Sequence, residues 1–218
     1  MALASTDLGS LGMAVMTDPD AATASLVRVR GLAVRRGERL LFQGLEFEVA
    51  PGGVLLLRGP NGVGKSTLLM TLAGIVRAEA GSIEGIEATR LHLLNYQSGL
   101  KGRLSVGENL RFWRDMYGAG GLDPEAALDR VGIGTLIDLE AGYLSSGQLR
   151  RLSLARLLVS HRPIWLLDEP SAALDAAGEA LLGQLIDAHR LGGGLAIVAT
   201  HHDLPLAEPG SIATLVLK

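Results

Sequence analysis

The segment GPNGVGKST, at residues 59–67, combines side-chain types that together bind phosphate groups. Glycines let successive backbone N–H groups point at an anion, lysine adds a compact positive charge, and a serine hydroxyl can bind Mg²⁺. The spacing of these residues is that of a P-loop, G-x-x-x-x-G-K-S, between an apolar run and a helical pattern. Lysine is rare in this chain, 3 residues against 17 arginines, so its presence here favours a role for an ammonium. The predicted phosphate site consists of Gly59, Pro60, Asn61, Gly62, Val63, Gly64, Lys65, Ser66 and Thr67.

Two adjacent carboxylates follow a second apolar run, in the sequence IWLLDEP at 164–170. Asp168 is placed to hold Mg²⁺, and Glu169 to orient or deprotonate an attacking water. The pair therefore indicates nucleotide hydrolysis. Each motif also has an interpretation without function. Residues 59–67 could be a chance glycine-rich turn, and Asp168 and Glu169 could lie in a solvated acidic turn. A GTPase would also need the base-reading pattern N-K-x-D, which the sequence lacks.

The stretch LSSGQ, at residues 144–148, opens a long amphipathic run. Ser145 or Ser146 could cap a helix by accepting a backbone N–H of its first turn. Capping accounts for one serine but leaves Gly147 and Gln148 without a role. A helix N-terminus with a hydroxyl and a bare glycine backbone is also suited to binding a phosphate. From these residues alone, both interpretations stay open.

Composition narrows the class of protein. The 218 residues are 48% hydrophobic and 20% charged, which favours one globular domain. The net charge of −3 gives no basic field and argues against nucleic acid as the main partner. No apolar run approaches the roughly 20 residues that cross a bilayer, and the absence of cysteine excludes disulfides and thiolate-bound metals. Residues 1–25 are small and polar, lack the features of a signal peptide, and are predicted to form a flexible tail.

Hydrophobic patterns predict an α/β fold. Residues 26–30 and 45–49 alternate in polarity, as strands with one solvated face do. Longer apolar runs are separated by helical patterns, an order that favours a parallel sheet flanked by helices. These runs lie at 54–57, 91–95, 164–167, 195–200 and 212–218. The predicted fold is a mostly parallel sheet with an N-terminal antiparallel β subdomain.

Residues 98–143 interrupt this order and are predicted to form an inserted helical subdomain. Within it, 105–118 and 123–132 have helical patterns, each closed by glycine. Phe112, Trp113 and Tyr117 gather three of the eight aromatic side chains in one predicted helix. They could form part of a partner surface, but packing inside the helical subdomain is the favoured role for some of them.

Six segments together resemble the ATP-binding cassette (ABC) ATPases in order and spacing: GPNGVGKST, Gln97, LSSGQ, LLDEP, SAALD and THHD. The resemblance covers residues 26–218 and implies a P-loop NTPase fold of the ABC type that binds ATP and Mg²⁺. In that family the signature segment, which is LSSGQ in this chain, contacts ATP held by the P-loop of a second subunit. Ser145, Gly147 and Gln148 are therefore expected to face a nucleotide across a nucleotide-sandwich homodimer. Ser146 departs from the family, which usually has glycine there.

The resemblance also implies catalytic roles. Gln97 is expected to contact Mg²⁺ and the attacking water. His201 is expected to contact the γ-phosphate, because it follows threonine as the family's histidine does, and His202 is expected to be a solvated neighbour. The implied catalytic set is Glu169, His201, Gln97 and Lys65. The implied metal ligands are Ser66, Gln97 and Asp168.

Two further positions are less specific. Asp175, in SAALD, resembles the aspartate that crosses the dimer interface in the family, but it could equally cap a helix. Arg36 stands where the family often has an aromatic residue stacked on adenine, and its guanidinium plane could stack instead.

Outside these motifs, the run SGLKGRLSVGENLRFW at 98–113 is similar to the haem-exporter ATPases of c-type cytochrome maturation, the CcmA type. That resemblance implies a CcmB-type integral membrane subunit and other cytochrome c maturation proteins as partners. It also implies a peripheral location on the cytoplasmic face of the inner membrane, with the membrane reached only through the partner. The alternatives are the ATPase of a drug or small-molecule exporter and, less favoured, a soluble ABC ATPase that acts on ribosomes or DNA. A phosphate-binding fold without hydrolysis would leave Asp168 and Glu169 idle.

Overall fold

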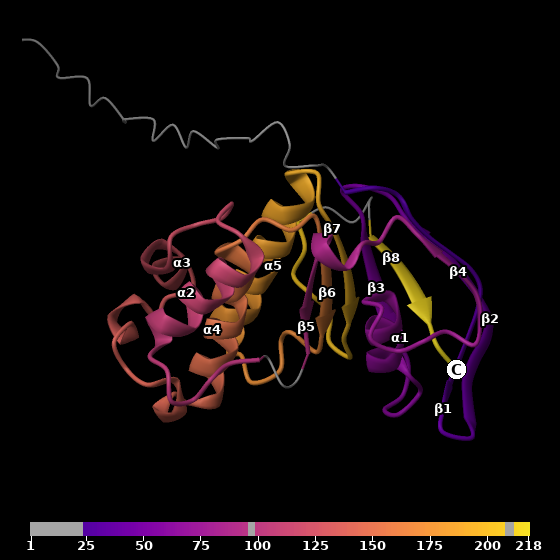
Figure 1. Cartoon of the computed structure of the whole chain (residues 1–218), viewed down its shortest axis with the longest axis horizontal. Helices are drawn as coiled ribbons and strands as arrows, with labels where there is room; N and C mark the ends of the chain where they lie inside the picture. The colour runs from indigo at the N-terminus through magenta and orange to yellow at the C-terminus, as the bar shows by residue number, and fades with distance from the viewer. Residues whose placement is uncertain (1–23, 96–98, 208–211) are drawn as a thin grey trace, which may run out of the picture.

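The computed structural model describes residues 24–95, 99–207 and 212–218. A five-stranded sheet lies at its centre, between the helices and the antiparallel strands (Figure 1). Every neighbouring pair in this sheet is parallel, and the strand order is β5-β6-β7-β3-β8. The strands are apolar because most of their residues lie between two layers, as in parallel sheets generally. Their bounds are β3 (Val54–Arg58), β5 (Leu91–Leu94), β6 (Ile164–Asp168), β7 (Leu195–Ala199) and β8 (Ile212–Val216). The predicted parallel sheet is confirmed.

A second, antiparallel sheet has the order β2-β1-β4. Its strands are β1 (Val27–Arg36), β2 (Arg39–Val49) and β4 (Ala80–Glu84). The N-terminal antiparallel subdomain is thus confirmed, and its first two strands are longer than their polarity patterns indicate. β4 was not predicted, because AGSIE has no clear alternation of polar and apolar residues.

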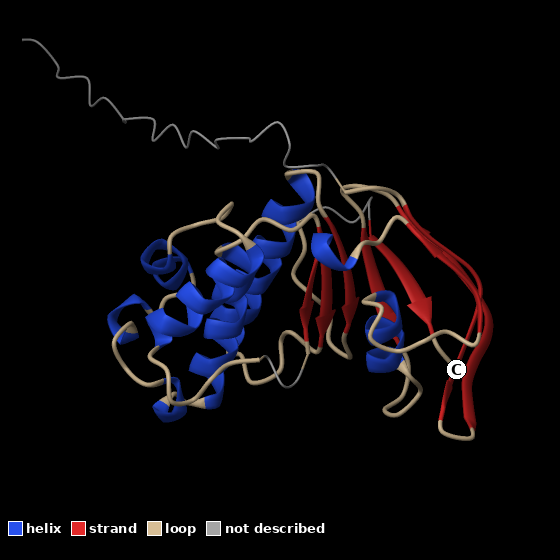
Figure 2. Ribbon diagram, in the orientation of Figure 1, coloured by secondary structure: helices blue, strands red, loops and turns tan. Residues whose placement is uncertain are grey.

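The parallel sheet lies between a group of helices on one side and the antiparallel sheet on the other (Figure 2). A separate hydrophobic core fills each side. Leu55 and Leu57 of β3 face the core shared with the antiparallel sheet and with α1 (Lys65–Leu72). Leu56, between them, faces the helical side, because successive strand residues point to opposite faces. The helices of that side include α4 (Ser146–Leu158) and α5 (Ala176–Leu191). The short helix η1 (Ala88–Arg90) leads into β5.

The predicted helices of the inserted segment are present as α2 (Val106–Tyr117) and α3 (Pro124–Arg130). Two short 3₁₀ helices follow, η2 (Gly134–Leu136) and η3 (Ala141–Tyr143). Leu110 of α2 and Leu128 of α3 are fully buried in the core that α4 also lines. The insertion therefore packs on α4, the helix that begins within the segment LSSGQ and is hereafter called the signature helix. Among the described residues, no helix is both long and apolar enough to cross a membrane.

The tail predicted for residues 1–25 lies almost entirely outside the described residues. Ala24, at its end, is 3% exposed, and its backbone N–H donates to the carbonyl of Gly193. The packed part of the chain therefore begins before residue 26.

Candidate nucleotide site

The phosphate loop joins β3 to α1, as predicted for a P-loop, and its backbone requires glycine at two positions. Gly59 has φ 137°, and a Cβ there would lie 2.5 Å from the carbonyl oxygen of Leu217. Gly64 has φ 116° and is the N-cap of α1, so no side chain caps that helix. The first N–H groups of a helix have no partner within the helix. The start of α1 therefore presents backbone donors where an anion can bind.

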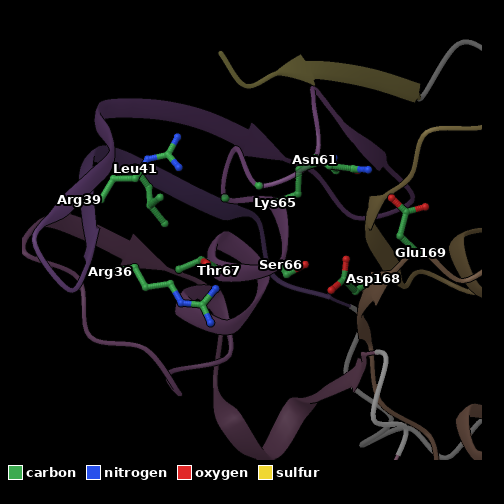
Figure 3. A pocket seen from close by; sticks show the side chains of 11 residues that line it. Arg36, Arg39, Leu41, Asn61, Lys65, Ser66, Thr67, Asp168 and Glu169 are labelled. Atoms are coloured by element: carbon green, nitrogen blue, oxygen red, sulfur yellow. The ribbon is translucent and has the colours of Figure 1, made fainter.

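A pocket of about 290 Å³ opens above this loop (Figure 3). Six of the nine predicted phosphate-loop residues line it, and so does Arg36, which the family resemblance placed beside adenine. Its lining consists of Arg36, Arg39, Leu41, Asn61, Gly62, Gly64, Lys65, Ser66, Thr67, Asp168 and Glu169. Sequence reasoning missed Arg39 and Leu41. Both residues lie at the start of β2, directly after the turn that follows Arg36. A hairpin at this turn could have been predicted, and it would have placed them near Arg36.

The strand order brings three separate segments to one end of the parallel sheet. The phosphate loop follows β3, Glu169 follows β6, and His201 lies just after β7, the strand between them. The carboxyl ends of parallel strands share an edge, where α/β folds bind their ligands. His201 accordingly lies between Lys65 and Glu169: its Nε2 is 3.0 Å from Lys65 Nζ and 3.2 Å from Glu169 Oε1.

The side chain of Lys65 is buried, with 6% exposure. Its ammonium donates to the carbonyl oxygens of Gly59 at 2.8 Å and Pro60 at 3.2 Å. His201 Nε2 can accept from Lys65 or donate to Glu169, but one neutral tautomer cannot do both. Lys65 and Glu169 line the pocket and His201 lies between them, so a phosphate bound there would compete with His201 for the ammonium.

The acidic pair lies at the end of β6. Asp168 pairs with Ala199 in the sheet, and the next residue, Glu169, turns sharply with φ 45°. The Glu169 backbone N–H donates to the Ala199 carbonyl at 2.8 Å, which fixes this turn. A left-handed backbone is uncommon for a residue with a side chain and is frequent at functional sites.

Ser66 and Asp168 both point into the pocket (Figure 3). A hydroxyl and one carboxylate, completed by phosphate oxygens and water, form the ligand set that Mg²⁺ prefers in nucleotide sites. Within the described ranges, no group of three or more histidine, cysteine or carboxylate side chains could hold a metal by itself. Ser66 and Asp168 fit a magnesium ion that binds together with a nucleotide, because phosphate oxygens would complete its ligands. Gln97, the third expected ligand, lies outside the described residues.

The signature segment forms the N-terminus of α4. Ser145 is the N-cap: its Oγ accepts from the Gln148 backbone N–H at 3.2 Å, and Gln148 Oε1 accepts from the Ser145 N–H at 2.9 Å. This reciprocal capping box gives Gln148 a structural role that the sequence interpretation did not assign, although the spacing S-x-x-Q carried the signal. Ser145 and Ser146 are exposed, and the segment does not line the pocket of its own chain.

Asp175 caps α5, which is the structural role that the sequence left open for it. Its carboxylate accepts from the Gly178 N–H at 2.8 Å and pairs with Arg151 at 3.0 Å. The Gly178 hydrogen bond, followed by Arg151, lowers the pKa of the Asp175 carboxyl. His202 is exposed, as expected.

The phosphate loop, the parallel sheet and the acidic pair define a P-loop nucleotide-binding protein. The family model described as ABC transporter matches residues 42–172. This chain belongs to that family and is an ATP-hydrolysing subunit coupled to transport.

Its relatives include the cytochrome c biogenesis ATP-binding export protein CcmA of Rhodopseudomonas palustris strain BisB5, 49% identical over 82% of this chain and 92% of the relative. The protein of the same name from Rhizobium johnstonii is 46% identical over 80% and 87%. Among solved structures, an ABC transporter ATP-binding protein from Pyrococcus furiosus has a TM-score of 0.76 at 25% identity, over 88% of this chain and 98% of the other. A cassette solved as a dimer with ADP and phosphate has a TM-score of 0.71 at 21% identity, over 81% and 88%, and supports the fold alone.

Proposed function

We propose that this chain is the ATPase subunit of an exporter that delivers haem for c-type cytochrome maturation. The observation that carries the proposal is its similarity to the cytochrome c biogenesis export proteins. That similarity extends over most of both chains, well beyond the nucleotide motifs. A drug or small-molecule exporter would share the nucleotide motifs, but the similarity does not favour it. The proposal has two parts: the chain drives a cytochrome c biogenesis exporter, and the group exported is haem.

In the proposed site, Lys65 and the N–H groups that open α1 bind the β- and γ-phosphates of ATP. Lys65 is already enclosed by loop carbonyls, so little side-chain freedom remains to be lost on binding. Phosphate oxygens would replace His201 as a partner of the ammonium. The released imidazole would then face the γ-phosphate, and Arg36 would lie beside the adenine.

Ser66 and Asp168, with Gln97, would hold Mg²⁺. When bound, Mg²⁺ neutralises charge on the phosphates. Glu169 would accept a hydrogen bond from the attacking water and take its proton. The fixed turn at Glu169 supports this role, because a catalytic base must be positioned before the water arrives.

The signature segment would complete the site of a second copy. Ser145 is exposed at the N-terminus of α4, and Gly147 adds no side chain beside it. With Gln148 and Asp175, these residues would contact the neighbouring nucleotide in a nucleotide-sandwich homodimer. The capping box does not exclude this role, because a serine hydroxyl can donate to a phosphate while it accepts the backbone N–H.

The partner in the membrane would be a CcmB-type integral subunit, with other maturation proteins beyond it. Exposed charged side chains of the run 99–113, namely Lys101, Arg103, Glu108 and Arg111, would contribute to that contact. Trp113 contributes less, because its ring is half-buried between the Arg156 guanidinium, 4.4 Å from its centroid, and Tyr117. The chain would then lie on the cytoplasmic face of the inner membrane and reach the bilayer only through its partner.

Deleting the gene tests the pathway. We expect c-type cytochromes to lose covalently attached haem, while b-type cytochromes persist. Complementation with Glu169→Gln should fail, because loss of the base slows hydrolysis by about a hundredfold or more. The measurement is a haem stain after denaturing electrophoresis, which retains covalent haem. Normal staining of c-type cytochromes in the deletion strain would contradict the haem proposal and leave the ABC ATPase assignment intact.

A further inference from the structure

One arginine of the signature helix bridges two distant segments. Arg151 donates from Nη1 to the carbonyl oxygen of Val131 at 2.9 Å, and its Nη2 lies 3.0 Å from Asp175 Oδ1. Val131 closes α3 in the inserted segment, and Asp175 opens α5. Beside it, Arg150 donates from Nε to the carbonyl of Ala172 at 3.2 Å. The helix that Ser145 caps is therefore attached to the loop between Glu169 and Asp175, hereafter the 169–175 loop.

The 169–175 loop has an unusual backbone that its neighbours must maintain. Glu169 has φ 45° and Ala173 has φ 65°, both in the left-handed region. A Cβ built on Gly147 would lie 3.1 Å from the Ala173 carbonyl oxygen, so the first turn of α4 packs directly on the loop. Such conformations persist only where surrounding contacts fix them. Helix α4 supplies three of these contacts, through Gly147, Arg150 and Arg151.

The contribution of Arg151 is positional more than energetic. Its side chain is 21% exposed and that of Asp175 is 71% exposed, and water screens such an ion pair strongly. A guanidinium is nevertheless planar and rigid, with donors pointing in different directions. Arg151 can therefore fix the spacing of α3, α4 and the 169–175 loop even though its ion pair adds little stability.

We infer that Arg151 is a positioning residue that couples the two nucleotide sites of the dimer. The inference rests on the proposed function, in which Ser145 contacts the neighbouring subunit's nucleotide and Glu169 acts on the chain's own. Arg151 joins the helix of the first residue to the loop of the second. Occupation of one site thereby shifts the equilibrium position of the hydrolytic loop that serves the other.

The test compares full-length chains that differ at one arginine. Arg151→Met removes both donors and keeps an apolar stem, whereas Arg151→Lys keeps the charge without the fork. Arg114→Met is the matched control, because Arg114 is 29% exposed and paired with Asp123 within the same inserted segment. The measurements are ATP hydrolysis against ATP concentration, ATP binding to the monomer, and the midpoint of thermal unfolding.

For the wild type and Arg114→Met we expect a Hill coefficient approaching about 2, the number of sites. For Arg151→Met we expect a Hill coefficient near 1 and a kcat about tenfold lower, within the usual range of coupling between sites. ATP binding to the Arg151→Met monomer should be unchanged, because the phosphate loop is intact. Arg151→Lys should recover part of the kcat and of the cooperativity.

Wild-type kcat and cooperativity in Arg151→Met would overturn the inference. A loss of monomer ATP affinity parallel to the loss of kcat would also overturn it, because that pattern indicates a merely structural role. If Arg151→Met does not fold, Arg151→Lys decides: full wild-type cooperativity overturns the inference and partial cooperativity supports it.

Glu169→Gln with Arg151 intact separates the proposed dimer from the proposed coupling. A monomer at saturating ATP would overturn the dimer and the coupling together, whereas a stable dimer alongside an Arg151→Met chain that behaves as wild type would overturn the coupling alone.

Discussion

Lys65 is a buried cation whose three hydrogen-bond partners are two backbone carbonyls and an imidazole. None of these partners is an anion, so they solvate the charge without neutralising it. Triphosphate oxygens would supply the missing negative charge, and charge-assisted hydrogen bonds are about twice as strong as neutral ones. The position of this one side chain therefore favours an anionic ligand.

Lys65→Ala should weaken ATP binding by about a hundredfold or more, because it removes charged hydrogen bonds to two phosphates. Calorimetric titration of the full chain with ATP measures this effect. Thermal unfolding provides the control: the variant should be at least as stable as the wild type without nucleotide, since a buried charge has been removed. Normal ATP affinity in the variant would contradict the role given to the phosphate loop.

At the scale of elements, two helices begin with the same device. Ser105 caps α2 and Ser145 caps α4, each with φ −63° and ψ 163°, and each with a complete capping box. The partner residues are Glu108 and Gln148. Because the local geometry is the same, any difference between the two serines must come from what lies beyond the helix. In the proposed homodimer, the nucleotide of a second subunit would supply that difference.

Ser105→Ala and Ser145→Ala should each lower the free energy of unfolding by about 1 kcal/mol, the usual effect of losing a serine cap. The unfolding midpoint should fall by about 2–4 °C in both. Only Ser145→Ala should also lose ATP hydrolysis and ATP-dependent dimerisation, measured by phosphate release and by sedimentation. Equal turnover in the two variants would show that Ser145 is a cap and nothing more.

The fold encloses two histidines: His92 of β5 is fully buried, and His189 of α5 is half-buried. Burial lowers the pKa of His92 to about 3, although its Nε2 lies 3.0 Å from the Ser160 carbonyl. Burial likewise lowers the pKa of His189 to about 4, and its ring stacks on Trp165. Both side chains are therefore neutral in the folded protein at pH values where an unfolded histidine is charged. The whole fold depends on pH through them.

The free energy of unfolding should decrease as pH falls below about 6.5, the pKa of an unfolded histidine. In that range the unfolded chain takes up protons that the folded chain does not bind, so acid favours unfolding. His92→Gln keeps a donor for Ser160 but does not titrate. Its slope between about pH 6 and 4.5 should be shallower than that of the wild type by up to about 1.4 kcal/mol per pH unit. Denaturant unfolding at each pH measures both slopes, and parallel curves would contradict the prediction.

The sequence by itself determined the features that depend on near neighbours in the chain. The phosphate loop, the acidic pair after β6 and the apolar strands all follow from spacing within a few residues. The sequence left open whether Ser145 or Ser146 caps α4 and whether Asp175 caps α5, and the structure gives Ser145 and Asp175 as the caps. Backbone sterics, helix capping and hydrophobic periodicity act over that distance. The resemblance to ABC ATPases used the same local segments, and the family match agrees with it.

Only the tertiary structure decided what lies next to what. Lys65 and His201 are 136 positions apart, and they meet because β7 lies between β6 and β3, an order that no single strand encodes. Arg39 and Leu41 reach the pocket through the path of a hairpin, and Arg151 reaches Asp175 through the packing of α4 on the 169–175 loop. Contacts of this kind depend on how the sheets and helices bury their apolar faces against one another. Many different local sequences are compatible with the same packing of layers, so the local sequence does not predict the contacts. The local chemistry was therefore readable from the chain, whereas its assembly into one site required the fold.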